Sequence, residues 1–334
     1  NVRYVLEGSI RKAGNRVRIN AQLLEGVTGN HIWAEKYDRE LEDIFEVQDE
    51  INGSVMSAIQ PSLMMAEIER SLKKHPDNLD AYDFFLRALP ELYAFEPERN
   101  HNALDLLHQA LELSPEYPEA LAHAAWGYEQ RSTRGWPDYA QSDRDAGVAL
   151  AQKAIATNSQ DPLVLALSAF VMIMAGKNYE LGLLTAQRAL QINPNIAQVS
   201  LFAGNSIMFS GGDLDKALDC FNEALKTSPL DPTAYLYYTS IAWIKLALGE
   251  IDEAVEASKK SVQMNPGWVS ALWLLSAALA EQGDVKSAKD LVDQILVLDE
   301  TTSITKISNS LMINSPLLME SLMNGLRKAG LPEE

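Results

Sequence analysis

One short phrase returns along this chain, and its return limits the possible folds more than any other feature of the sequence. Residues 188–194 read RALQINP, in which small and apolar residues lead to a helix-stopping Asn-Pro pair. Related phrases occur at 109–115, 153–159, 223–229 and 260–266, with a worn copy at 294–300. A spacing of about 35 residues with helical patterning is typical of a two-helix repeat, which cannot bury its apolar face without neighbours. We therefore expect stacked helix pairs.

Two small residues, seven positions apart, recur in the second helix of each unit. The earlier positions are Ala103, Gly147, Gly182, Ala217, Ala254 and Ala288, and the later ones are Ala110, Ala154, Ala189, Ala224 and Ser261. Because residues seven apart share one helix face, each second helix offers a shallow seam to a neighbouring helix. Asn or Ser before Pro ends these helices, and glycine-acid pairs such as Gly249-Glu250 join the two helices of a unit.

This pattern resembles the tetratricopeptide repeats over about 77–300. The unit at 269–300 fits best, with family-typical residues at Leu272, Leu275, Ala278, Gly283 and Ala288. The second unit departs from the family through an insertion around 132–137, and Ser159 replaces the terminal Pro. The resemblance implies a mostly α-helical, right-handed solenoid of about six repeats with a concave groove, while the insertion leaves the local curvature open.

The first helices of the later units carry almost no charge. Residues 163–176, 196–212 and 267–280 have none, and 233–248 has only Lys245. Such helices are either sandwiched within the solenoid or face an apolar partner. In the second interpretation Phe170, Phe209, Trp243 and Trp273 line a groove for an apolar or amphipathic segment, including a segment of the chain itself.

Some family members grip a peptide's terminal carboxylate with Lys, Arg and Asn on the first helices. This chain offers only Asn205 and Lys245 at such places, so we do not expect a carboxylate clamp. The predicted groove therefore consists of Phe170, Asn205, Phe209, Trp243 and Trp273, and its expected partner is a protein or peptide segment, the chain's own segment or a second copy.

The front of the chain follows a different period. Val17, Ile19, Ala21 and Leu23 alternate with polar residues, which predicts a half-buried antiparallel strand. Turns at 13–15 and 28–30 give three strands. Apolar residues at helical spacing over 44–59 predict a covering helix up to Pro61, and 62–74 can resume it. A three-stranded sheet with one helix is marginal alone, which predicts further strands upstream.

Several phrases of this front piece resemble the TolB-like α/β domain that precedes tetratricopeptide repeats in bacterial signalling proteins. They are YVLEGS (4–9), RKAGNRVRI (11–19), TGNHIWA (28–34) and EDIFEVQDEI (42–51), and GLRKAGLP (325–332) resembles the usual ending of those chains. The predicted domains are thus an incomplete TolB-like domain at 1–75, repeats at 76–300 and a capping helical segment at 301–334. In that family an upstream output domain is frequently a class III adenylate or guanylate cyclase and sometimes a winged-helix DNA-binding domain.

The sequence shows no constellation that would support catalysis. The five histidines include no pair three or four apart, so no metal pair on a helix is expected, and no phosphate-binding or dinucleotide-binding glycine motif occurs. Cys220 lies in an apolar helical stretch, where it serves as core filler. We expect no metal, no cofactor and no enzymatic activity in this chain.

Charge and hydropathy narrow the class of partner. The 28 Lys and Arg residues against 46 Asp and Glu residues give a net charge of −18, which disfavours nucleic acid and anionic membranes. No apolar run reaches the ~20 residues of a membrane span. A single cysteine fits a reducing, cytoplasmic setting. The resemblance to those signalling proteins implies a protein-interaction and regulatory module of a bacterial cyclase as the function, and the alternative is a scaffold for an envelope or transcription-regulator complex.

Overall fold

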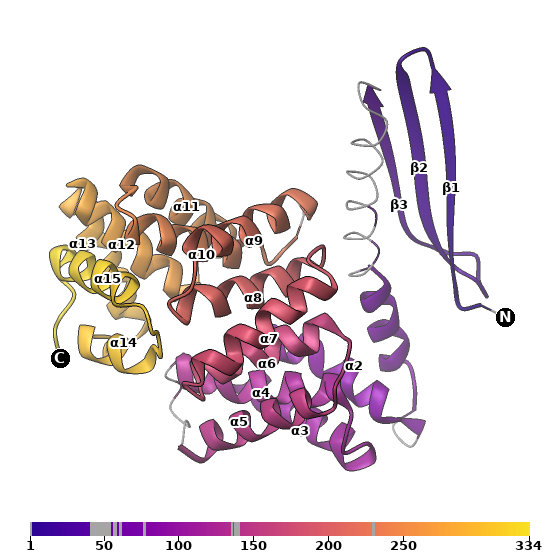
Figure 1. Cartoon of the computed structure of the whole chain (residues 1–334), viewed down its shortest axis with the longest axis horizontal. Coiled ribbons are helices and arrows are strands. Elements are labelled where there is room, and N and C mark those ends of the chain that lie inside the picture. The colour runs from indigo at the N-terminus through magenta and orange to yellow at the C-terminus, as the bar shows by residue number, and fades with distance from the viewer. Residues whose placement is uncertain are drawn as a thin grey trace. The chain divides into compact units, whose positions relative to one another are not determined.

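The computed structural model describes residues 2–40, 55, 59, 62–75, 78–134, 136, 141–228 and 231–334. The chain divides into two compact units, residues 1–87 and residues 88–334 (Figure 1). The division into three domains that the sequence suggested, at 75 and 300, stays a prediction. The predicted helix over 44–59 and the phrase at 42–51 lie outside the described residues, except for Val55 and Ile59, which are helical.

The first unit contains a three-stranded antiparallel sheet in the order β1-β2-β3. The strands are β1 (Tyr4–Ala13), β2 (Arg16–Glu25) and β3 (His31–Glu40). The sheet confirms the predicted alternation, because Val17, Ala21 and Leu23 on β2 are buried. Gly14, with φ of 60°, supplies the left-handed conformation of the two-residue turn between β1 and β2.

The basic residues of β2 lie on the exposed side of the sheet. Arg16 and Arg18 both form ion pairs with Asp38 of β3, at 3.0 and 2.8 Å. The hydrogen bond from Arg18 lowers the pKa of that carboxyl, and Arg16 adds to the effect. This cross-strand arrangement is the outward face that the sequence predicted. Residues 62–72 are helical, and Glu67 within them accepts hydrogen bonds from Arg3 and Arg70.

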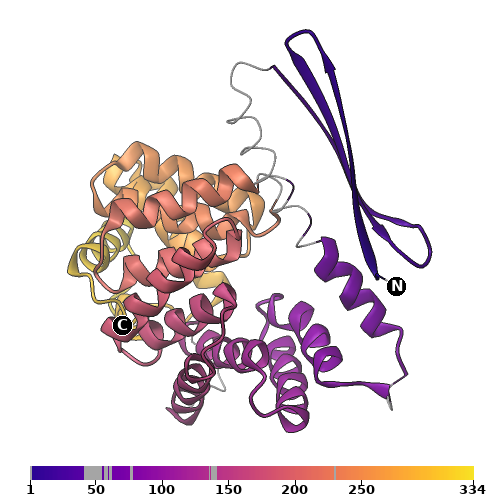
Figure 2. The same cartoon turned by 45° about the vertical axis from the view of Figure 1, so that its right-hand side comes forward.

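Twelve helices, α2 to α13, follow one another along the chain as six pairs, and the two helices of each pair from α4 to α13 pack against each other. Their bounds are α2 (Ala81–Leu92), α3 (Pro97–Leu113), α4 (Pro118–Thr133), α5 (Gln141–Ala156), α6 (Pro162–Met174), α7 (Tyr179–Ile192), α8 (Ala197–Phe209), α9 (Leu214–Thr227), α10 (Ala234–Ala247), α11 (Ile251–Met264), α12 (Val269–Gln282) and α13 (Val285–Leu298). Two further helices follow, α14 (Ile304–Ser310) and α15 (Pro316–Ala329). Within the second unit the pairs stack side by side in chain order (Figure 2).

Local residues account for where these helices begin and end. Asp161 and Asp213 cap α6 and α9, because their side chains accept hydrogen bonds from backbone N–H groups of the first turn. Gly283 ends α12 with φ of 99°, a left-handed conformation that suits glycine. Helix α7 ends at Ile192 and α11 at Met264, each just before the Asn-Pro pair that was expected to stop it.

The predicted seam of small residues lies in the core of the stack. All eleven small residues of the two predicted positions are buried, and a Cβ on Gly182 would lie 2.5 Å from Cγ1 of Ile173. Close approach of neighbouring helices therefore depends on these residues. The second unit is a solenoid of helix pairs of the tetratricopeptide type, and the predicted fold class is confirmed.

Candidate functional site

The sequence predicted a groove on the surface that the first helices of the pairs form. Phe209 and Trp243 are buried there, with 7% and 4% of their surface exposed. Phe170, Asn205 and Trp273 are half-buried. The surface is thus not a uniformly open groove, and the first helices α6, α8, α10 and α12 are buried on most sides.

Five aromatic side chains form a continuous series across these first helices. Trp126 of α4 contacts Phe202 of α8, with ring centroids 5.0 Å apart, and Phe202 contacts Phe170 of α6 at 5.6 Å. Phe170 also lies 6.5 Å from Phe209, which contacts Trp243 of α10 at 5.3 Å. We call these five residues the aromatic chain. It brings together three of the residues that the sequence predicted, namely Phe170, Phe209 and Trp243.

Trp273 lies apart from the aromatic chain. It is half-buried and packs against the apolar core of the second unit. The indole Nε1 of Trp273 is buried and has no hydrogen-bond partner among the described residues.

The chain's own carboxy-terminal helix covers the later part of this surface. Helix α15 packs against α10 and α12 (Figure 1). The indole Nε1 of Trp243 donates a 3.1 Å hydrogen bond to the carbonyl oxygen of Leu318. Gly325 permits the close approach, because a Cβ there would lie 2.6 Å from Cβ of Ala277 on α12. The sequence allowed for an internal occupant but did not identify this helix.

Helix α15 is amphipathic, and its apolar face is fully covered. Leu318, Leu322 and Leu326 have no exposed surface. These leucines recur every four residues and so share one side of the helix. That spacing, with Gly325 beside it, is the sequence signal that predicts a helix lying in a narrow groove.

Hydrogen bonds of the backbone fix both ends of the carboxy-terminal segment. Before α15, the backbone N–H of Asn314 donates to the carbonyl oxygen of Phe209 at 2.8 Å, and its side chain donates to the carbonyl oxygen of Ser210 at 3.1 Å. After α15, the carbonyl oxygen of Pro332 accepts from the N–H of Ile304 at 2.9 Å. The segment is therefore built into the first-helix surface from α8 to α12.

The polar groups considered for a carboxylate clamp have partners within the chain. The side-chain oxygen of Asn205 accepts a 2.8 Å hydrogen bond from Ser240 Oγ. Lys245 forms ion pairs with Glu250 and, at 2.7 Å, with Glu253. These hydrogen bonds raise the pKa of the Lys245 ammonium, the one from Glu250 most strongly. Both side chains are therefore already engaged by other residues of the chain.

Helix α4 carries buried ionisable groups that the sequence analysis did not single out. Glu129 is 2% exposed, and burial raises the pKa of its carboxyl from 4.5 to about 7, although the nearby charge of Arg134 opposes that shift. His123 is 3% exposed, and burial lowers the pKa of its imidazole to about 4. Its Nδ1 lies 2.7 Å from the carbonyl oxygen of Glu119. Period and spacing give no signal for these charges, because they follow from packing at the insertion.

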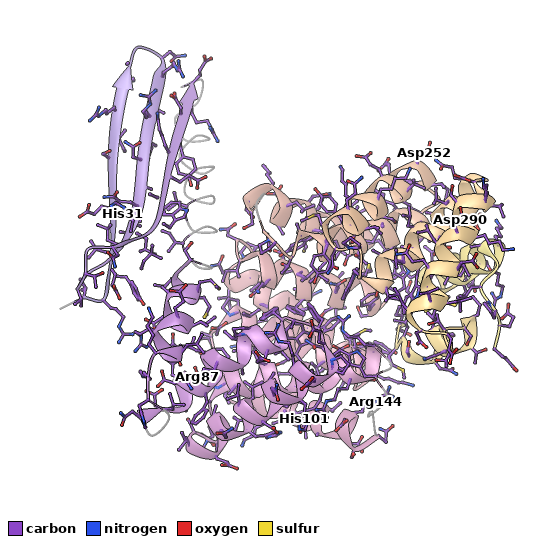
Figure 3. All side chains as sticks on the ribbon, turned by 180° about the vertical axis from the view of Figure 1, so that it is seen from behind. His31, Arg87, His101, Arg144, Asp252 and Asp290 are labelled. Carbon is purple, nitrogen blue, oxygen red and sulfur yellow. The ribbon has the colours of Figure 1, made fainter. Side chains whose placement is uncertain are left out.

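Within the described ranges no three His, Cys, Asp or Glu side chains gather to hold a metal ion. His101 lies on the outer surface, 3.6 Å from Asp105 (Figure 3). Cys220 is half-buried, and burial raises the pKa of its thiol to about 11, which disfavours the reactive thiolate. Among the same residues, the helices are too short or too polar to span a membrane.

Comparison with known proteins supports the repeat assignment. The model of the tetratricopeptide repeat family matches residues 235–267, which include all of α10 except Ala234 and the whole of α11. The putative adenylate cyclase 3 of Rhizobium meliloti is 40% identical over 174 residues, which are 50% of this chain and 29% of that protein. The transcriptional regulator HilA of Salmonella typhimurium is 27% identical over 194 residues, which are 57% of this chain and 34% of HilA.

A solved structure of the human IFIT1 dimer with m7Gppp-AAAA superposes with a TM-score of 0.57 at 17% identity, covering 80% of this chain and 63% of that one. At this identity the likeness concerns the fold alone. The chain spans about a third of the length of the curated relatives named above. The repeat match and the helix stack agree with a solenoid of tetratricopeptide-type helix pairs, and the first-helix surface of that solenoid is the candidate site.

Proposed function

We propose that this chain is the non-catalytic interaction and regulatory module of a bacterial signalling protein, the rear part of a class III adenylate or guanylate cyclase. The observation that carries the interaction role is α15 itself: an amphipathic helix lies on the first helices α10 and α12, with Leu318, Leu322 and Leu326 fully buried. The same surface chemistry suits an external helix or peptide. The 40% identity to a putative adenylate cyclase supports the link to a cyclase.

The part of the surface beside α15 is the proposed contact region for a partner. Phe170 and Asn205 are half-buried, and both belong to the groove that the sequence predicted. The partner is a protein or peptide segment, or a second copy of this chain, and binding changes the arrangement of the attached output domains. The net charge of −18 disfavours nucleic acid as a partner. The proposed module acts in the cytoplasm, needs no cofactor and does not insert into a membrane.

A pull-down with matched variants tests the interaction role. Chains carrying Phe170→Ala and Asn205→Ala together should lose partners that the unaltered chain retains from the bacterial lysate. Leu184→Ala is the control, because Leu184 is 65% exposed on the second helix α7. Helical circular dichroism checks folding. Identical partners for all three chains would contradict the proposed groove, and turnover of a nucleotide by residues 1–334 alone would contradict the non-catalytic assignment.

A second candidate function follows from the likeness to HilA. Its 27% identity over 194 residues supports a module that serves a transcription-regulator complex without cyclase activity. The coding sequence upstream of Asn1 separates the two candidates. A cyclase domain with paired metal-binding aspartates supports the first candidate, and a winged-helix domain supports the second.

A further inference from the structure

One arginine, directly after α4, packs against two aromatic rings that also contact each other. Arg134 comes directly after the end of α4 at Thr133. Its guanidinium carbon lies 4.4 Å from the ring centroid of Phe95 and 4.3 Å from that of Trp268. The two centroids are only 5.6 Å apart, so the guanidinium packs against an adjoining pair of rings. Arginine suits this role because its charge is delocalised over a plane that stacks on rings.

The three residues come from parts of the solenoid that are far apart in the chain. Phe95 lies between α2 and α3, in the first pair, and Arg134 follows the first helix of the second pair. Trp268 directly precedes α12, the first helix of the sixth pair. In a simple solenoid each repeat contacts only its neighbours. The Phe95–Arg134–Trp268 stack thus joins pairs that the repeat pattern alone would keep apart.

Other rings hold the stack from both sides. Phe95 and Trp268 also contact each other, with centroids 5.6 Å apart. Trp126, the first member of the aromatic chain, lies 5.7 Å from Phe95, and Tyr235 lies 5.4 Å from Trp268. The stack is consequently continuous with the aromatic chain along the first helices.

The backbone of Phe95 is strained. Its φ is 57°, a left-handed conformation that is unfavourable for a bulky side chain. Such a conformation persists only where surrounding contacts determine it. The contacts of the Phe95 ring with Trp126, Trp268 and Arg134 provide that determination.

A buried ionisable residue, Glu129, acts on Arg134 beside the two rings. Glu129 acts electrostatically on Arg134 from the same end of α4, and its Oε1 has no hydrogen-bond partner among the described residues. The Nε atom of Arg134 is likewise shielded and unpartnered within the described part of the chain. The two rings, at 4.4 and 4.3 Å, are therefore the contacts that hold the Arg134 guanidinium within the described part of the chain.

We propose that the contacts of Arg134 with Phe95 and Trp268 link the first two helix pairs to the sixth pair and thereby fix the curvature of the superhelix. We call these contacts the clasp. The inference goes beyond partner binding, since it assigns to the insertion the control of the solenoid's shape. Opening the stack would release Phe95 from its strained conformation and separate the connection α2–α3 from the start of α12.

Small-angle X-ray scattering and hydrogen exchange on the purified chain test the clasp. Arg134→Ala should enlarge the radius of gyration and make the amides around Phe95 and Trp268 exchange about tenfold faster. Arg134→Lys keeps the charge but not the stacking plane, and should give an intermediate effect. Arg188→Ala, an exposed arginine on α7, is the control and should change neither measurement.

Unchanged scattering and exchange in Arg134→Ala would overturn the proposal, because Arg134 would then only fill space. If Arg134→Ala loses its helical circular dichroism, Trp268→Leu decides the matter, since leucine keeps apolar volume but offers no ring to the guanidinium. A folded Trp268→Leu chain with faster exchange at Phe95 supports the clasp. The same chain with exchange like that of the unaltered protein rejects it.

Discussion

The first-helix surface of the second unit differs between two regions. One region is covered by an apolar helix, and the other contains buried ionisable groups. Over α10 and α12 the surface is covered by α15, whose Leu318, Leu322 and Leu326 are fully buried. At α4, next to the insertion, it contains Glu129, Arg134 and His123. Regular pairs present a repeated apolar surface that a helix can cover. The irregular pair places ionisable groups inside, where each charge needs a partner or a shifted pKa.

The difference has consequences for stability. Apolar closure depends on area and shape, so it changes little with pH and salt. Closure by buried charges depends on protonation, because each buried charge loses its hydration. We therefore expect substitutions in α15 to change stability at all pH values, and substitutions in α4 to change how stability varies with pH.

The largest effect is expected at the centre of α15. Leu322→Ala removes a side chain with no exposed surface and should lower the free energy of unfolding by about 3 kcal/mol. Urea unfolding followed by circular dichroism measures the change. Leu317→Ala is the matched control, because Leu317 is 49% exposed on the same helix. Similar losses in both variants would mean that α15 does not depend on its buried face.

A pH-dependent effect is expected from Glu129→Gln. The pKa of Glu129 is raised from 4.5 to about 7, so its contribution to stability is present below pH 4.5 and is lost as pH rises through 7. Glutamine stays neutral, so the variant should gain stability over the wild type by up to about 3 kcal/mol at pH 8 and by little at pH 4. Urea unfolding across this pH range measures the difference.

His123 makes the opposite contribution, which sharpens the test. The pKa of its buried imidazole is lowered from 6.5 to about 4, so its contribution is present above pH 6.5 and is lost as pH falls through 4. Without the Glu129 carboxyl, the free energy of unfolding of the Glu129→Gln variant should therefore rise with pH. Glu98→Gln, on the exposed surface of α3, is the control. A difference from wild type that is constant with pH would show that the Glu129 carboxyl is hydrated.

The two regions also differ in how far the sequence predicted them. The seam residues, such as Gly182 and Ala217, follow from repetition, because each copy must fit the same neighbour. The stack of Phe95, Arg134 and Trp268 does not, because it joins distant pairs through residues outside the repeated phrase. The position of α15 on α10 and α12 could not be predicted either. An amphipathic pattern shows which face of a helix is buried, but it does not show which surface covers that face.

A smaller effect is expected where α15 meets the aromatic chain. Trp243→Phe keeps a ring but removes the indole donor to the carbonyl oxygen of Leu318, and should cost about 1 to 2 kcal/mol. Trp273→Phe is the matched control, because its indole Nε1 has no hydrogen-bond partner among the described residues. Equal losses in urea unfolding would show that the hydrogen bond to Leu318 adds nothing to the docking of α15.

The smallest effect is expected at the rim of α15, where Lys328 forms an ion pair with Glu281 of α12. The two side chains are 57% and 23% exposed, so solvent and salt screen their attraction. Lys328→Ala should change the free energy of unfolding by about 0.5 kcal/mol or less. A double-mutant cycle with Glu281→Ala measures the coupling. A coupling above about 1.5 kcal/mol would mean that ionic contacts also hold α15, and the contrast between an apolar region and a charged region of the first-helix surface would then fail.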